Sequence, residues 1–197
     1  MNQTLKTRRR LRPDDRRAQL LEAAIICYAR MGVERAGHGD IAKLTGVSTP
    51  TVFNYFSNRD ALTQAVLDHV KSEILKIFET VVGTPAPKKT GRAHLLLLAG
   101  NLDTLVDTQP DLIKVWLNWS VSFGKNVRPI YLNFQNQLLD KLHFAVEGLK
   151  PSGRAGERAK SRIIMGAAQT YIMMKLDDTD TDTLIKFIES VTQIIPE

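Results

Sequence analysis

The sequence predicts an all-α protein of about nine helices. Apolar residues recur at helical spacing along most of the 197 residues, and no stretch shows the sustained alternation of a half-buried strand. Residues 38–56 read as two short helices joined by a tight turn, the pattern of a helix-turn-helix. We therefore expect residues 1–57 to form a basic arm and a three-helix DNA-binding domain. Residues 58–197 should form a second, larger helical domain.

Three residues of the first short helix share an apolar face: Ile41, Ala42 and Leu44. Gly46 follows and can adopt the positive φ that a sharp helix stop requires. Ser48 or Thr49 can then cap the second helix with a hydroxyl oxygen. Pro50 falls in its first turn, where a missing N–H donor costs little.

The second short helix has the size of a helix that enters the major groove. Its spacing predicts three side chains that pack back onto the first helix, namely Val52, Phe53 and Phe56. Three others should point outward: Thr51, Asn54 and Tyr55. We therefore interpret the outward face of this helix as a DNA-reading surface.

The net charge of +6 is concentrated in the first twelve residues, which carry five basic side chains and no acid. A basic arm on a nearly neutral body indicates a polyanionic partner. A solvated tail with no partner is the alternative, and the neighbouring helix-turn-helix favours double-stranded DNA instead.

The chemistry of each side chain suggests its part in DNA binding. Guanidinium groups suit phosphates and a narrow minor groove, and the arm offers Arg8, Arg9, Arg10 and Arg12. Hydroxyl groups suit phosphate oxygens, and the candidates are Ser48, Thr49, Thr51 and Tyr55. Asn54 can pair with a base edge or anchor on a phosphate. Lys43 and Arg59 are expected beside the DNA backbone, and His38 is expected to act as a cap or phosphate contact.

These segments also resemble a known family, the TetR-family transcription regulators. Within that family the resemblance is to the LuxR/HapR/SmcR type of quorum-sensing master regulator. It rests on Gly37-His38, residues 40–42, Val47-Ser48 and residues 51–56, and on a second group at residues 114–120, Val127, Pro129 and residues 136–139. The resemblance implies a homodimer that binds a near-palindromic operator and regulates genes according to cell density. Thr49-Pro50 stands where that type carries two small apolar residues, which puts a shared operator in doubt.

Several breaks divide the remaining helices. Pro13 should end the arm, with Asp14 or Asp15 capping the first helix. The run from Ser57 to Asp60 has the pattern of a capping box that opens a long helix. Prolines and glycines at 83–91 interrupt the chain, and 148–156 reads as a loop. We expect the later helices at 92–109, 112–123, 127–146, 159–176 and 183–195.

The resemblance further implies a ligand-type cavity in the second domain. Its candidate lining combines apolar side chains with two amides: Ile77, Phe78, Trp116, Trp119, Asn133, Phe134 and Gln137. A few amide groups in an apolar pocket would orient a small apolar ligand. The alternative is an ordinary aromatic core with surface amides.

The last two helices suggest a homodimer. The helix at 159–176 is apolar nearly all round and must be covered on most sides. The final helix carries a matching stripe of Leu184, Phe187, Ile188, Val191 and Ile194. Two helices from each subunit would make a four-helix interface, although both helices could instead close the core of a monomer.

No catalytic or cofactor-binding set stands out, so we expect neither an enzyme nor a cofactor. The four histidines are scattered, and Cys27 lies on an apolar helix where a buried thiol is the usual state. Asp178, Asp180, Asp182 and Glu189 have the spacing of a calcium loop. Thr183 occupies the place that requires glycine, so we interpret these acids as a turn that caps the last helix.

A single cysteine and the lack of a long apolar run predict a cytoplasmic protein that associates with no membrane. The resemblance implies a bacterial protein that associates with the nucleoid through DNA. One alternative function is a TetR-type repressor that a ligand releases, in efflux or lipid metabolism. Another is a helical small-molecule-binding protein or enzyme that binds DNA without sequence preference.

Overall fold

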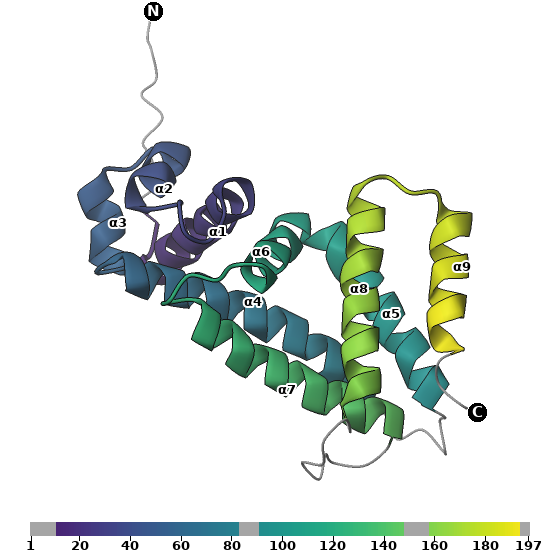
Figure 1. Cartoon of the computed structure of the whole chain (residues 1–197). Helices are drawn as coiled ribbons and strands as arrows, with labels where there is room; N and C mark the ends of the chain where they lie inside the picture. Colours follow the sequence, from purple (N-terminus) through teal and green to yellow (C-terminus); the bar gives the residue numbers. More distant parts are fainter. Residues whose placement is uncertain (1–10, 83–90, 148–157, 194–197) are drawn as a thin grey trace, which may run out of the picture.

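The structure, a computed structural model, describes residues 11–82, 91–147 and 158–193. These residues form nine helices and no strand, as the sequence predicts (Figure 1). The helices are α1 (Pro13–Met31), α2 (His38–Thr45), α3 (Thr49–Tyr55), α4 (Arg59–Val82), α5 (Gly91–Thr108), α6 (Pro110–Ser120), α7 (Arg128–Glu147), α8 (Ala159–Leu176) and α9 (Thr181–Thr192). The loops expected at 83–91 and 148–156 lie almost entirely outside the described residues.

Helices α1, α2 and α3 pack into a three-helix unit at one end of the molecule (Figure 1). Its core includes Leu20, Tyr28, Ile41 and Val52, none of which retains exposed surface. The long helix α4 leaves this unit beside α3 and runs on into the larger unit, where it packs against α5, α6 and α7. The N-terminal unit is therefore joined to the rest of the chain by the connection into α4, by packing of α1 on α4 and α6, and by hydrogen bonds between the α1–α2 and α6–α7 loops.

Helices α5 to α9 form the larger unit, with α8 and α9 side by side at its far end (Figure 1). Trp119 anchors its core between α6 and α7. The indole is completely buried, stacks on Phe134 at 5.4 Å and donates from Nε1 to the Val127 carbonyl oxygen at 3.1 Å. None of the helices within the described ranges is long and apolar enough to cross a membrane.

The helix starts confirm some predictions and correct others. Ser48 caps α3 by accepting from the Thr51 N–H at 3.3 Å, and Asp180 caps α9 by accepting from the Thr183 N–H at 3.0 Å. The predicted cap of α1 is wrong, because Pro13 already begins the helix and Asp14 and Asp15 lie in its first turn.

The predicted capping box of α4 is wrong by one residue. Asn58, and not Ser57, places its side-chain oxygen 2.8 Å from the Ala61 N–H. An amide oxygen satisfies an unpaired N–H of the first turn as well as a hydroxyl does.

Candidate nucleic-acid interface

A sharp turn sets α3 against α2. Gly46 ends α2 in the left-handed conformation, with φ 68° and ψ 30°, and its N–H donates to the Ala42 carbonyl oxygen. Ser48 then opens α3 with the cap described above. Val52 is completely buried under the helix, so the opposite face of α3 is directed to solvent.

The exposed face of α3 consists of Thr49, Pro50, Phe53 and Asn54. Thr51 and Tyr55, which the sequence places outward, are half-buried. Asn54 is the one side chain on this face with both a hydrogen-bond donor and a carbonyl-type acceptor, the pair that matches an adenine edge. It is therefore the best placed residue of α3 for reading a base.

Phe53 corrects the sequence prediction that Phe53 and Phe56 are both core residues. Phe56 is 2% exposed, as expected, whereas Phe53 is 45% exposed. The Phe53 ring stacks on the His38 imidazole with 3.9 Å between centroids. Phe53 is therefore a surface residue beside Asn54 that helical periodicity alone could not identify.

His38 also departs from its predicted role as a cap or phosphate contact. The ring is buried under Phe53, and its Nε2 lies 2.7 Å from the Phe56 carbonyl oxygen. Gly37 occupies the N-cap position of α2, and its N–H donates to the Asp40 carboxylate at 3.0 Å. His38 thus holds the C-terminal end of α3 against α2 and is not free to reach a phosphate.

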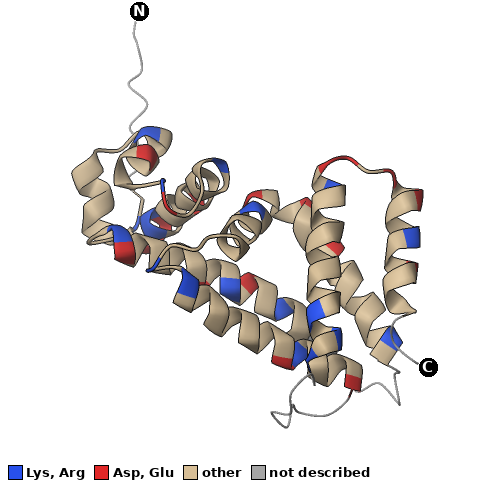
Figure 2. Ribbon diagram, in the orientation of Figure 1, with Lys and Arg blue, Asp and Glu red and all other residues tan. Residues whose placement is uncertain are grey.

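Helix α3 itself carries no charged side chain (Figure 2). Lys43 is exposed on the adjacent α2, and Leu44, predicted to be buried, is exposed beside it. Arg59 follows α3 and donates to the Glu34 carbonyl oxygen. Cationic groups thus lie on both sides of a neutral helix. In such an arrangement the flanking cations suit phosphates, and the uncharged helix suits base edges.

The predicted arm is only partly described. Arg12 is exposed and pairs with Asp15, with 3.0 Å between Nε and Oδ2. Arg8, Arg9 and Arg10 lie outside the described residues.

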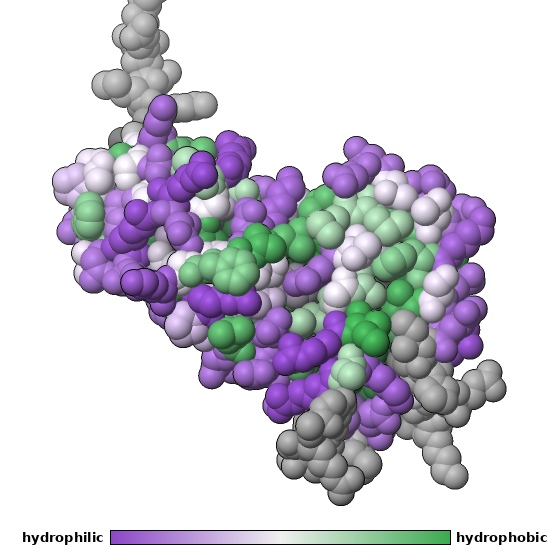
Figure 3. All heavy atoms as spheres, viewed as in Figure 1, coloured by the Kyte–Doolittle hydropathy of each residue, from purple (hydrophilic) through white to green (hydrophobic). Residues whose placement is uncertain are grey.

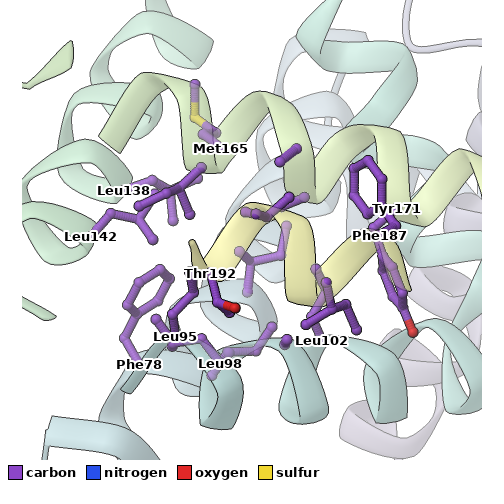
Figure 4. A pocket seen from close by; sticks show the side chains of 18 of the residues that line it. Phe78, Leu95, Leu98, Leu102, Leu138, Leu142, Met165, Tyr171, Phe187 and Thr192 are labelled. Atoms are coloured by element: carbon purple, nitrogen blue, oxygen red, sulfur yellow. The ribbon is translucent and has the colours of Figure 1, made fainter. Parts of the chain in front are cut away.

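The second candidate site is an apolar cavity of about 100 Å³ between helices of the larger unit. Side chains from α4 to α9 converge on it (Figure 4). Ile77, Phe78 and Trp116 line it as predicted, and the Trp116 Nε1 has no hydrogen-bond partner within the described residues. The sequence prediction missed most of the lining, including Leu98, Leu102, Met165, Tyr171 and Phe187.

Four residues predicted for this cavity lie elsewhere. Trp119 and Phe134 are core residues that stack on each other. Asn133 and Gln137 face away from the cavity, and the Gln137 Nε2 donates to the Asn133 Oδ1 at 2.6 Å. The cavity consequently lacks the two amides expected in it and is suited to an apolar molecule.

No group of three or more histidine, cysteine, aspartate or glutamate side chains in the described ranges could hold a metal ion. Burial raises the pKa of the Cys27 thiol, which disfavours the reactive thiolate. Asp180, one of the acids with calcium-loop spacing, caps α9.

The fold and this surface define a two-unit helical protein with a helix-turn-helix at one end. The family of bacterial regulatory proteins called the tetR family matches residues 20–66, which run from α1 into α4. Residues 20–66 therefore form a DNA-binding domain of the TetR family.

Individual relatives agree with this assignment. The chain is 35% identical to the HTH-type transcriptional regulator LuxR from Vibrio harveyi over 136 residues, which cover 68% of this chain and 65% of LuxR. The match thus spans just under two thirds of LuxR. It is 38% identical to the HTH-type transcriptional regulator TtgR from Pseudomonas putida over 124 residues, 63% of this chain and 59% of TtgR.

Solved structures share the fold. A TetR-like transcriptional regulator from Rhodococcus sp. RHA1 superposes with a TM-score of 0.72 at 17% identity, over 93% of this chain and 97% of that one. The regulator FadR from Bacillus subtilis, in complex with stearoyl-CoA, gives a TM-score of 0.67 at 20% identity, over 90% and 96% of the two chains.

Proposed function

We propose that this chain is a homodimeric, sequence-specific DNA-binding transcription regulator. The observation that carries the proposal is the exposed, uncharged face of α3, where Phe53 and Asn54 stand together. Asn54 would pair with a base edge, and the Phe53 ring would contact a thymine methyl group in the major groove. The hydroxyl of Thr49 and the basic groups of the arm and α2 would hold the phosphates.

We further propose that residues 1–57 form a DNA-binding domain and that residues 58–197 form a dimerisation domain. Apolar side chains gather over α8 and α9 (Figure 3), and Ile163, Met173 and Ile185 are each about half exposed. A second copy that covers these side chains would place two α3 helices on one duplex. Two such helices about 34 Å apart would read a near-palindromic operator in successive major grooves.

Regulation by cell density is the proposed biological setting. It is supported by the resemblance of residues 37–56 and 114–139 to quorum-sensing master regulators, together with the match to LuxR. The substitution of Thr49-Pro50 at the start of α3 favours an operator of its own for this chain.

The test is a selection of bound duplexes from a random pool at physiological ionic strength. The proposal predicts enrichment of one inverted repeat with half-sites about one helical turn apart. If the bound duplexes share no sequence, and affinity changes with salt concentration but not with sequence, the proposal is contradicted. The protein would then bind DNA only through its charge.

A second candidate is a repressor that a small apolar molecule releases from DNA, and the apolar cavity favours it. The fold is shared with FadR of Bacillus subtilis, whose structure contains stearoyl-CoA. Fatty acids and small aromatic compounds should then raise the melting temperature and lower operator affinity, and Ala168→Leu, which fills the cavity, should abolish both effects. Compounds that change neither quantity would leave the ligand-independent regulator as the proposal.

A further inference from the structure

One carboxylate links the DNA-binding unit to the larger unit. Glu34 lies in the loop between α1 and α2, directly before the helix-turn-helix. Its Oε1 accepts hydrogen bonds from the Ser122 hydroxyl and from the Gly124 N–H, the second at 3.1 Å. Ser122 and Gly124 belong to the loop between α6 and α7, about ninety residues further along the chain. We call the contact of Glu34 with this loop the Glu34 clasp.

Glu34 also contacts the segment that follows α3, through its main-chain carbonyl group. The Glu34 carbonyl oxygen accepts from the Arg59 guanidinium at the first residue of α4. Glu34, which precedes the helix-turn-helix, therefore contacts both the start of α4, which follows the helix-turn-helix, and the α6–α7 loop of the larger unit.

The α6–α7 loop is braced on its own side. The Arg128 Nη1 donates to the Ser120 carbonyl oxygen at 2.9 Å, and its guanidinium lies 4.5 Å from the centre of the Phe123 ring. The loop that carries the hydroxyl and the N–H contacted by Glu34 is thus held by contacts within the larger unit. Gly124 leaves the carboxylate its space, since a Cβ there would stand 2.2 Å from the Glu34 Oε1.

The other contacts between the two units are the packing of α1 on α4 and α6 and two further hydrogen bonds, one of 3.3 Å from the Asn118 Nδ2 to the Ala29 carbonyl oxygen and one of 2.8 Å between the Tyr28 and Thr63 hydroxyls. Apolar packing has little directional preference, whereas hydrogen bonds to a carboxylate fix distance and angle. The clasp is therefore suited to fixing how the DNA-binding unit is rotated on the larger unit.

We propose that Glu34 is a positioning residue that sets the spacing at which the dimer reads its two half-sites. The inference rests on the proposed function, because the distance between two α3 helices matters only when both bind one duplex. Removal of the clasp lets each DNA-binding unit rotate about its connection to α4 while the reading face of α3 stays intact.

The test measures spacing preference apart from base preference. Operators that differ by one base pair between the half-sites are titrated with the wild type, Glu34→Ala and Gly124→Ala. Gly124→Ala displaces the carboxylate without changing the charge. In both variants the ratio of affinities for the best and the altered spacing should fall by at least about fivefold, while the preferred bases within each half-site remain the same.

Two controls separate this effect from a loss of charge or stability. Glu79→Ala removes an exposed acid on α4, and Glu34→Gln keeps an oxygen that can accept from Ser122 and Gly124. Both should keep the wild-type spacing ratio, and melting curves establish that every variant is folded. Unchanged ratios in Glu34→Ala and Gly124→Ala, or an equal loss in Glu34→Gln, would overturn the inference. A wild type with no preferred duplex would instead contradict the proposed function.

Discussion

Phe53 lies on α3 and Phe56 directly follows the helix, and their side chains have opposite environments. Phe56 fills the core of the DNA-binding unit and Arg17 lies over its ring, 5.1 Å from the centroid. Phe53 rests on the His38 imidazole and keeps nearly half of its surface. Periodicity assigns both residues to one side of a helix, but α3 ends at Tyr55 and the backbone of Phe56 is extended, with φ −134° and ψ 97°, so the helical spacing does not apply to Phe56.

The two phenylalanines should respond differently to truncation. Phe53→Ala should lower operator affinity at least about tenfold, because a contact with a thymine methyl is lost, and should cost only about 1 kcal/mol of unfolding free energy. Phe56→Ala leaves a cavity and should cost about 3 kcal/mol or more. Urea unfolding and operator titration measure the two quantities, and the prediction is wrong if Phe53→Ala unfolds the protein as readily as Phe56→Ala.

A polar cluster joins α5 to α8 in the larger unit. The Asp103 carboxylate accepts hydrogen bonds from the Tyr171 hydroxyl and the Lys175 ammonium group, and Lys175 also contacts Asp107 at 2.8 Å. Burial raises the pKa of Asp103, but the hydrogen bonds from Lys175 and Tyr171 and the charge of Lys175 together lower it by more. The pKa of Asp103 therefore lies below its usual value of 3.8. The ionised carboxylate is therefore the form that stabilises the fold.

This lowered pKa predicts a dependence of stability on pH. The contribution of Asp103 is complete above the pKa of the unfolded state and is lost as the pH falls through the lower pKa of the folded state. Asp103→Asn should cost about 1 kcal/mol at pH 7, and the difference from the wild type should shrink below about pH 4. Urea midpoints at both pH values measure this. An equal difference at both would contradict it, and Asp182→Asn, which changes an exposed acid, provides the control.

At the scale of the element, the start of α4 shows that a sequence pattern can locate a helix start without identifying the residue that caps it. The sequence contains two adjacent residues able to cap the helix, Ser57 and Asn58, and the capping-box pattern favoured the first. The structure uses the second, whose amide oxygen reaches the Ala61 N–H. Position relative to the N–H groups decides between such neighbours, and that position depends on how α3 ends.

Replacement of each residue distinguishes the two caps. Asn58→Ala should lower the unfolding free energy by about 1 kcal/mol, since a first-turn N–H loses its acceptor. Ser57→Ala should change it by less than about 0.5 kcal/mol. Thermal and urea unfolding measure both variants, and the reverse order would show that the serine is the cap.

The sequence anticipated the helices well because each buries an apolar stripe at a fixed period. Most ends agree to within two or three residues, and the α2–α3 turn with its Ser48 cap was predicted from local chemistry. The cavity was predicted only in part. Its lining combines α5, α8 and α9 through side chains such as Leu98, Met165 and Phe187, and no local pattern specifies which helices meet.

At the scale of the whole molecule, the proposed dimer depends on the apolar face of α8 and α9. Ile163 and Met173 are 51% and 48% exposed, so glutamate at either position costs the monomer little. Ile163→Glu and Met173→Glu should each weaken dimerisation at least about a hundredfold, since a charge is buried without a partner. Sedimentation velocity measures this, with Leu132→Glu on α7 as the control at similar exposure. Dimers as tight as the wild type in both variants would place the interface elsewhere.

Operator binding by the wild type and Asn54→Ala tests the central claim most directly. Each protein is titrated with the selected operator and with a scrambled duplex of equal length at physiological ionic strength. The account predicts that the wild type prefers the operator by about a thousandfold or more, and that Asn54→Ala loses most of this preference while its binding to the scrambled duplex is unchanged. Equal affinities of the wild type for both duplexes would contradict the account.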